Sequence, residues 1–214
     1  MKKIIFLLIF VLATLTACMK EEPKVNYGNA SLQTHYQALE EIAYDAQLIV
    51  EVELTGESKN IRYKEADFNV IEAQVKKVIK GDEQLNSKMI NVLEVAAFSL
   101  NDHKKNILFL KKYDGPVTDN AYFVAGVYQG KLNLGSNNKI VYDADKYGGV
   151  KTYQSDLEGL DAKSVEEKVA EAVKNARPPK KLNSDENQLK KNEEESRKLL
   201  EQDKKLEKVQ PEQK

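Results

Sequence analysis

Apolar and polar residues alternate along several short segments of the chain, with the period of a β-strand that buries one face. The clearest segment is 48–54, where apolar residues alternate with Glu51 and Glu53. A second run, over residues 68–79, alternates twice in different phase. A phase change within one strand predicts a bulge or a bend, as small barrels use at their corners.

Further short apolar runs follow after residue 80. Glycine, asparagine and aspartate separate them, and no helical spacing comes between them. The polar segment 56–64 is expected to be a connection. Five or six such strands favour a small antiparallel barrel or sandwich. The five predicted strands are residues 48–54, 68–79, 89–95, 107–110 and 121–129, the last of which continues after Gly130 into a hairpin partner at 132–134, and residues 140–142 would add a sixth.

Two segments have the three- and four-residue spacing of an amphipathic helix. The first covers residues 32–45 and the second residues 156–176, so the strands are expected between two helices. Pro178 and Pro179 cannot continue a helix, and the predicted folded domain is residues 31–176. The predicted fold class is therefore mainly β with flanking helices (α+β).

The last part of the chain, residues 177–214, is rich in charged residues and poor in apolar ones. Its leucines recur near heptad spacing, but polar residues occupy the other seam positions, so a coiled coil is poorly supported. We expect a charged tail that is partly helical or disordered.

The N-terminus has the organisation of a bacterial lipoprotein signal. Two lysines precede an apolar run over residues 4–15, and Leu-Thr-Ala-Cys, ending at Cys18, resembles a lipobox. Cys18 is the only cysteine, so it has no disulfide partner in the chain. We predict that residues 1–17 are removed, that Cys18 is lipidated and that residues 18–30 form a tether. A plain secretory signal with an incidental cysteine is the alternative.

Charge and lipidation together define the expected location. Two of the 33 basic residues lie in the signal, so the mature chain has 31 basic and 34 acidic residues and a net charge near −3. This balance does not indicate a polyanionic partner, and nucleic acid binding is disfavoured. A diacylglyceryl group carries two acyl chains, which hold a protein stably in a bilayer. The predicted location is the extracytoplasmic face of the cell membrane, with the N-terminal lipid as the anchor.

The sequence gives little indication of catalysis. It contains no Gly-x-Ser-x-Gly elbow and no phosphate-binding glycine loop. His35 and His103 lack flanking residues with the spacing of zinc ligands, and the thiol of Cys18 is assigned to the lipid. We therefore predict no enzymatic activity, no cofactor and no metal site.

The most distinctive local stretch is residues 142–153, where three tyrosines and two aspartates surround a pair of glycines. Tyrosines can stack on sugar rings or grip a peptide, and loops at barrel ends often carry such sites. A turn-rich connection whose tyrosines cover the barrel end is the alternative. The single Asp-x-Asp pair lacks the glutamate and the spacing of a calcium loop. The candidate ligand-binding residues are Tyr142, Asp143, Asp145, Tyr147 and Tyr153.

Several strand and turn segments between residues 45 and 131 follow one another in a recognisable order. They are Ala-Gln-Leu-Ile-Val-Glu-Val (46–52), Val-Lys-Lys-Val-Ile-Lys-Gly (75–81), Ile-Asn-Val (90–92), Ile-Leu-Phe-Leu (107–110) and Tyr-Gln-Gly-Lys (128–131). This order resembles a group of small surface lipoproteins of Gram-positive bacteria. The resemblance implies an OB-like barrel and carries no activity, ligand or functional residue. The sequence departs from the pattern at Glu51, where a glycine is common, and at Asn133.

Three functional hypotheses follow from these observations. The first is a noncatalytic binding module at the cell envelope, whose barrel loops contact a wall polymer, a peptide or an envelope protein. The second is an accessory subunit of a membrane complex, docked through the charged tail. The third, with the least support, is an envelope hydrolase that uses carboxylates distant in sequence. Removing residues 180–214 separates the first two, because only the tail-docked subunit would lose its partner.

Overall fold

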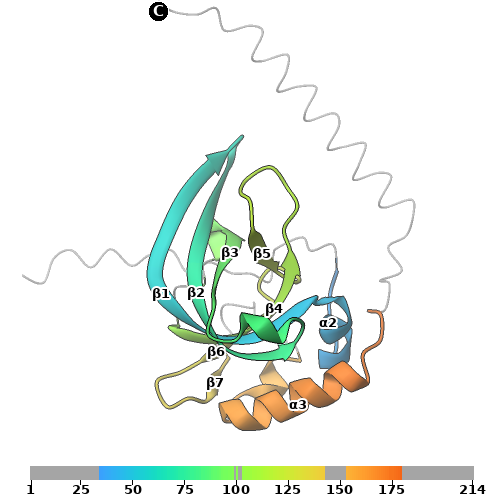
Figure 1. Ribbon diagram of the computed structural model, residues 1–214. Coiled ribbons are helices and arrows are strands. Elements are labelled where there is room, and N and C mark those ends of the chain that lie inside the picture. The colour runs from blue at the N-terminus through green and yellow to red at the C-terminus, as the bar shows by residue number, and fades with distance from the viewer. Residues whose placement is uncertain (1–33, 99, 101–102, 143–152, 180–214) are drawn as a thin grey trace, which may run out of the picture. The chain divides into compact units, whose positions relative to one another are not determined.

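The computed structural model describes residues 34–98, 100, 103–142 and 153–179. The predicted signal, the lipidation site and tether, and tail residues 180–214 lie outside these ranges. The described helices and strands (Figure 1) are α2 (Leu39–Asp45), β1 (Leu48–Tyr63), β2 (Ala66–Lys80), β3 (Met89–Val95), β4 (Lys105–Lys112), β5 (Ala121–Val124), β6 (Lys131–Leu134), β7 (Ile140–Val141) and α3 (Ala162–Lys174), with the 3-10 turns η2 (Glu83–Leu85), η3 (Ala96–Phe98) and η4 (Ser155–Leu157).

Five of the strands form a closed ring. The order β1–β2–β3–β5–β4 returns to β1, because β1 pairs with both β2 and β4. β6 pairs with β4 outside this ring, and β7 pairs with β6. The prediction of a mainly β chain with helices is therefore confirmed.

The predicted purely antiparallel arrangement is wrong for one pair of strands. β3 and β5 run parallel, with Asn91 opposite Ala121 and Leu93 opposite Phe123. A ring with an odd number of strands cannot alternate direction all the way round, so at least one neighbouring pair must be parallel. The alternation of residues along each strand contains no information about this closure.

β1 is much longer than the sequence predicted. Segment 56–64, expected to be a connection, continues the strand to Tyr63, and the chain turns into β2 through Lys64 and Glu65. Most side chains of this extension are exposed, so no apolar alternation marks it, although its backbone pairs with β2. Hydropathy reports burial and not backbone hydrogen bonding, which explains the error.

The predicted irregularity is present in β2, which has one extra residue between the partners of Ile49 and Val50 and another between the partners of Glu51 and Val52. β1 carries a larger bulge, which the sequence did not predict. Leu54 pairs with Ala73 and Ser58 with Ile71, so β1 carries two extra residues between these pairs. Gly56 lies in this bulge at φ +87°, a backbone conformation that glycine adopts without strain. The bulge faces the part of β2 where the alternation changes phase.

The sheet separates two hydrophobic clusters. One contains residues of all five ring strands, including Val50 and Leu108, and fills the inside of the ring. The other contains Ile49 and Phe109 together with residues of the helices α2 and α3. β1 and β4 therefore bury side chains on both faces, which is why their sequences contain continuous apolar runs.

Both helices are shorter than predicted. Residues 34–38 precede α2 without helical structure, and α3 begins at Ala162 and ends at Lys174. Gly159, at φ +77°, separates α3 from the 3-10 turn η4. The Asp161 carboxylate accepts a hydrogen bond from the Ser164 amide at 2.9 Å and caps the N-terminal end of α3.

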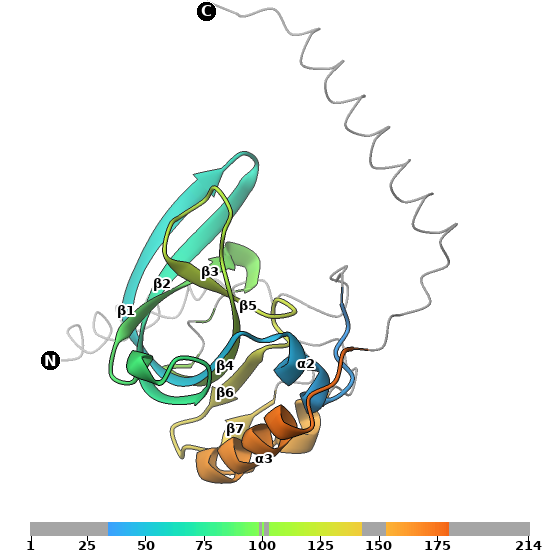
Figure 2. The same cartoon turned by 45° about the vertical axis from the view of Figure 1, so that its right-hand side comes forward.

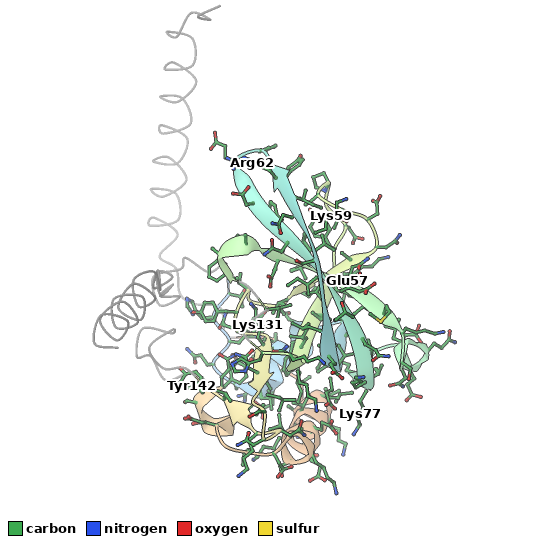
Figure 3. The ribbon with its side chains drawn as sticks, turned by 90° about the vertical axis from the view of Figure 1, so that its left-hand side faces the viewer. Glu57, Lys59, Arg62, Lys77, Lys131 and Tyr142 are labelled. Atoms are coloured by element: carbon green, nitrogen blue, oxygen red, sulfur yellow. The ribbon has the colours of Figure 1, made fainter. Side chains whose placement is uncertain are left out.

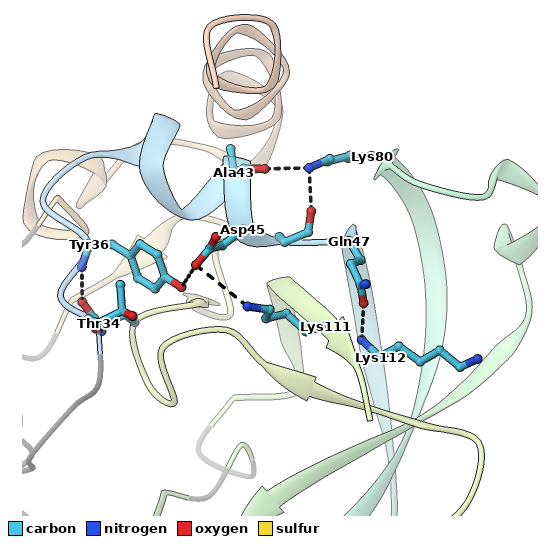
Figure 4. Close-up of polar contacts among 10 residues, drawn as sticks. Thr34, Tyr36, Ala43, Asp45, Gln47, Lys80, Lys111 and Lys112 are labelled. Atoms are coloured by element: carbon cyan, nitrogen blue, oxygen red, sulfur yellow. Dashed lines mark hydrogen bonds and ion pairs between the residues drawn. The ribbon is translucent and has the colours of Figure 1, made fainter. Parts of the chain in front are cut away.

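Polar side chains attach the C-terminal end of α2 to the sheet (Figure 4). The Lys80 ammonium donates to the carbonyl oxygens of Ala43 and Ala46 at 2.8 and 2.6 Å. The Tyr36 hydroxyl donates to the Asp45 carboxylate at 2.7 Å. Burial lowers the pKa of Lys80, whereas the nearby charge of Asp45 opposes this shift. A cation at this end satisfies carbonyl groups that the helix leaves unpaired.

Candidate ligand-binding pocket

A pocket of about 210 Å³ opens where β3 and β5 stop pairing. The last paired residues are Leu93 and Phe123, and both contribute to its walls. Side chains from β2, β3, β5 and β6 line it, together with residues of η3 and of the connections that follow β4 and β5. Most of the lining is apolar, and its aromatic members are Phe68, Phe98, Tyr113 and Phe123.

Two oppositely charged residues lie in the pocket wall. The Lys131 Nζ atom is 3.8 Å from Glu94 Oε2, and the two side chains are 6% and 3% exposed. Lys131 also donates a hydrogen bond to the Phe98 carbonyl oxygen, and the Asn69 amide donates to Glu94 Oε1 at 3.5 Å. Pairing and hydrogen bonds offset the cost of removing both charges from water. The pocket thus contains polar groups, but the positive charge of Lys131 and the negative charge of Glu94 cancel, so its net charge is zero. Figure 3 shows Lys131 at β6.

Contacts between aromatic rings fix the pocket walls. Tyr113 and Phe123 meet edge to face, with ring centroids 6.4 Å apart, and Phe98 stacks on Tyr128 at 6.2 Å. The Tyr113 hydroxyl accepts a hydrogen bond from the Val117 amide at 3.1 Å, which holds the connection between β4 and β5 against the pocket. These geometries are the favourable ones for aromatic pairs.

The turn after β5 places a strained residue in the wall. The predicted strand 121–129 ends at Val124, and residues 125–130 form turns in which Gly126 and Val127 both have φ +60°. Gly126 suits this position, since a Cβ there would lie 2.7 Å from Cε2 of Tyr36. Val127 is β-branched and lines the pocket, and this conformation costs it roughly 1–3 kcal/mol.

Tyr153, the last residue of the predicted ligand-binding loop, and the adjacent Gln154 hold the segment that carries Lys131. The Tyr153 hydroxyl donates to the Gln129 carbonyl oxygen. The Gln154 amide nitrogen lies 3.3, 3.0 and 2.7 Å from the carbonyl oxygens of Tyr128, Gln129 and Lys131. Tyr153 is only 7% exposed and belongs to the hydrophobic cluster that contains residues of α2 and α3. It does not line the pocket, but its hydroxyl holds the segment that leads to Lys131.

The structure describes only the two ends of the predicted ligand-binding loop. Tyr142 is half-buried (Figure 3) and interacts electrostatically with Tyr128. Burial raises the pKa of Tyr128, and Tyr142 contributes to the same shift. The ligand-binding role of the loop stays a prediction. The remaining predicted site residues, which lie outside the described part of the chain, are Cys18, Asp143, Asp145 and Tyr147.

Sequence reasoning missed this pocket because its residues come from separate segments and share no local motif. One signal was available in β2, where Phe68 is out of phase with Ile71 and Ala73, both of which belong to the ring interior. This difference indicated that Phe68 faces a second environment, but it did not show which residues meet it there.

No protein-family model matches this chain, and no curated protein matches it in sequence. Within the described ranges, no helix has both the length and the apolar character needed to cross a membrane. In the same part of the chain, histidine, cysteine, aspartate and glutamate residues form no group of three or more that could hold a metal ion. The pocket, with its aromatic walls and its buried ion pair, is the feature on which we base a functional proposal.

Proposed function

We propose that this protein is a lipid-anchored extracytoplasmic lipoprotein that acts as a noncatalytic binding module at the cell envelope. The pocket between β3 and β5 is its ligand site. The observation that carries this proposal is the strained Val127 in an aromatic pocket that also contains a buried ion pair. Ligand sites are typically apolar cavities with a few placed polar groups, and backbone strain concentrates at functional positions.

The ring of strands supports an OB-like barrel as the fold. An OB-fold is a partly open five-stranded barrel that binds ligands on its β2–β3 face and through the loops after β1 and β4. The pocket takes Phe68 from β2, Val95 from β3 and Tyr113 from the β4–β5 connection. Figures 1 and 2 show this connection beside the β1–β2 hairpin.

The polar groups of the pocket support binding and not catalysis. Glu94 and Lys131 are engaged with each other. General acid–base catalysis needs a group whose proton is available to the substrate at a suitable pKa. The two side chains occupy each other in a buried ion pair, which favours a fixed recognition surface.

Blocking the pocket tests the binding function. Val95 and Val141 are matched controls, because both are valines in strands, each 39% exposed, and only Val95 lines the pocket. In full-length lipoprotein used to capture membrane partners, Val95→Trp should lose the captured partner and Val141→Trp should keep it. Equal capture by both variants at equal thermal stability would exclude this pocket as the site.

The anchor is tested separately at Cys18, because the thiol is the acceptor of the lipid in the proposed modification. Cys18→Ala should move the protein from the detergent phase to the aqueous phase and remove the acyl mass. Phase partitioning and mass spectrometry measure the two effects. A wild-type protein without acyl mass would refute the anchor and leave the pocket proposal intact.

A further inference from the structure

We infer that the pocket accepts a neutral aromatic side chain of a polypeptide partner. This inference rests on the proposed binding function and deepens it, because it selects a protein ligand over a wall polymer. Three features of the described residues support it: the composition of the walls, the charge of the pocket and the conformation of Val127.

The walls suit one aromatic group. Four aromatic rings line the pocket, and its volume of about 210 Å³ fits a single side chain rather than a polymer. An incoming ring can make the offset and edge-to-face contacts that Tyr113 and Phe123 already make with each other. Aromatic residues that enter desolvated pockets are the usual energetic centres of protein interfaces.

The charge of the pocket disfavours both main classes of wall polymer. Glu94 neutralises Lys131 at 3.8 Å, so an anionic chain would enter a site that offers it no net positive charge. A sugar needs several hydrogen bonds to replace those it makes with water, and seven of the ten lining residues have no side-chain hydrogen-bonding group.

The conformation of Val127 gives the wall a shape that a strain-free turn would lack. Glycine would adopt φ +60° without cost but would contribute no side chain. Valine at this position places a branched apolar group against the ligand space. The three carbonyl contacts of Gln154 fix the neighbouring segment, so the pocket is preorganised for its ligand.

Fluorine NMR on the full chain tests the ligand class. The chain contains six phenylalanines, of which Phe68, Phe98 and Phe123 line the pocket, and Phe109 is fully buried in the other core and serves as an internal reference. Protein labelled with fluorophenylalanine is titrated in detergent micelles with N-acetyl-phenylalanine amide, with an N-acetylglucosamine dimer and with glycerol phosphate. Single phenylalanine-to-tyrosine variants assign the resonances.

We expect saturable shifts of the three pocket resonances with the aromatic amide alone and no shift of Phe109. Val95→Trp should weaken this response roughly tenfold or more, and Val141→Trp should leave it unchanged. Pocket shifts caused by the sugar or by glycerol phosphate, without a response to the amide, would overturn the ligand class and keep the pocket as the site. If no probe shifts the pocket, the ligand class also fails. The proposed function fails with it only if Val95→Trp retains its membrane partner.

Discussion

Glu94 and Lys131 form an ion pair across the pocket wall, although 37 positions separate them in the chain and their side chains are 3% and 6% exposed. The pair joins β3 to β6, two strands that do not pair with each other. A buried ion pair adds little net stability relative to apolar residues, but removing one partner leaves an uncompensated charge.

The first prediction therefore compares single and double variants of this pair. Lys131→Met should lower the free energy of unfolding by about 3–5 kcal/mol, since it leaves the Glu94 carboxylate buried without its cation. Glu94→Leu combined with Lys131→Met should restore most of this loss. Urea denaturation measures both effects. If the double variant is as unstable as Lys131→Met alone, the loss of unfolding free energy does not come from the unpaired Glu94 carboxylate.

The second prediction concerns the strained turn. Val127→Gly should raise the free energy of unfolding by about 1 kcal/mol, because relief of the φ +60° strain exceeds the entropy cost of glycine. Val141→Gly, in a regular strand, should instead lower stability by roughly 0.5–1 kcal/mol. The same Val127→Gly variant should bind the aromatic amide more weakly. A loss of stability at Val127 comparable to that at Val141 would refute the strain.

The third prediction tests the support behind the pocket. Gln154→Leu should lower the free energy of unfolding by about 1–3 kcal/mol, because the carbonyl oxygens of Tyr128, Gln129 and Lys131 each lose a buried hydrogen bond from this side chain. Gln84, which is exposed, is the matched control, and Gln84→Leu should stay within about 0.5 kcal/mol of wild type. Chemical denaturation supplies the comparison, and equal effects at the two glutamines would contradict this role.

The fourth prediction is a pH dependence that originates between β1 and α3. Burial raises the pKa of Glu51, and a hydrogen bond and charge repulsion from Glu166 raise it further, whereas Lys105 and Lys77 oppose the shift. Lys77 forms an ion pair with Glu166. The folded protein therefore retains the Glu51 proton above the pH at which the unfolded chain releases it, about 4.3 for a free glutamate.

The sign of the effect follows from proton binding. In the window above about pH 4.3 and below the raised folded pKa, the folded state binds more protons than the unfolded state, so stability falls as pH rises. Glu51→Gln should remove this decline and make the protein more stable than wild type at neutral pH. Glu57→Gln, on the exposed part of the same strand, should leave the pH profile unchanged. Thermal melts across this pH range measure the effect. If Glu51→Gln leaves the dependence of stability on pH unaltered, Glu51 is not the group that causes the decline.

The sequence by itself determined the features that depend on neighbouring residues. The alternation around Glu51 and Glu53 identified a strand, and the phase change after Phe68 indicated an irregularity in the sheet. Both signals exist because successive side chains of a strand point to opposite faces, so buried residues recur at every second position. The β-rich class followed from several such segments in succession. Lipidation at Cys18 is likewise a local prediction, and it stays a prediction.

Only the tertiary structure decided how these segments meet. The parallel pairing of β3 with β5 follows from closing an odd number of strands, and the extension of β1 to Tyr63 follows from pairing that no apolar pattern marks. Val127 lies in segment 121–129, which the sequence predicted to be a strand. In the structure it belongs to the turns between β5 and β6, and it has φ +60° there. Lys131, which pairs with Glu94, follows these turns. The pocket could not be predicted, because its lining residues come from segments far apart in the sequence. Within each segment the lining residue belongs to no motif that distinguishes it from its neighbours.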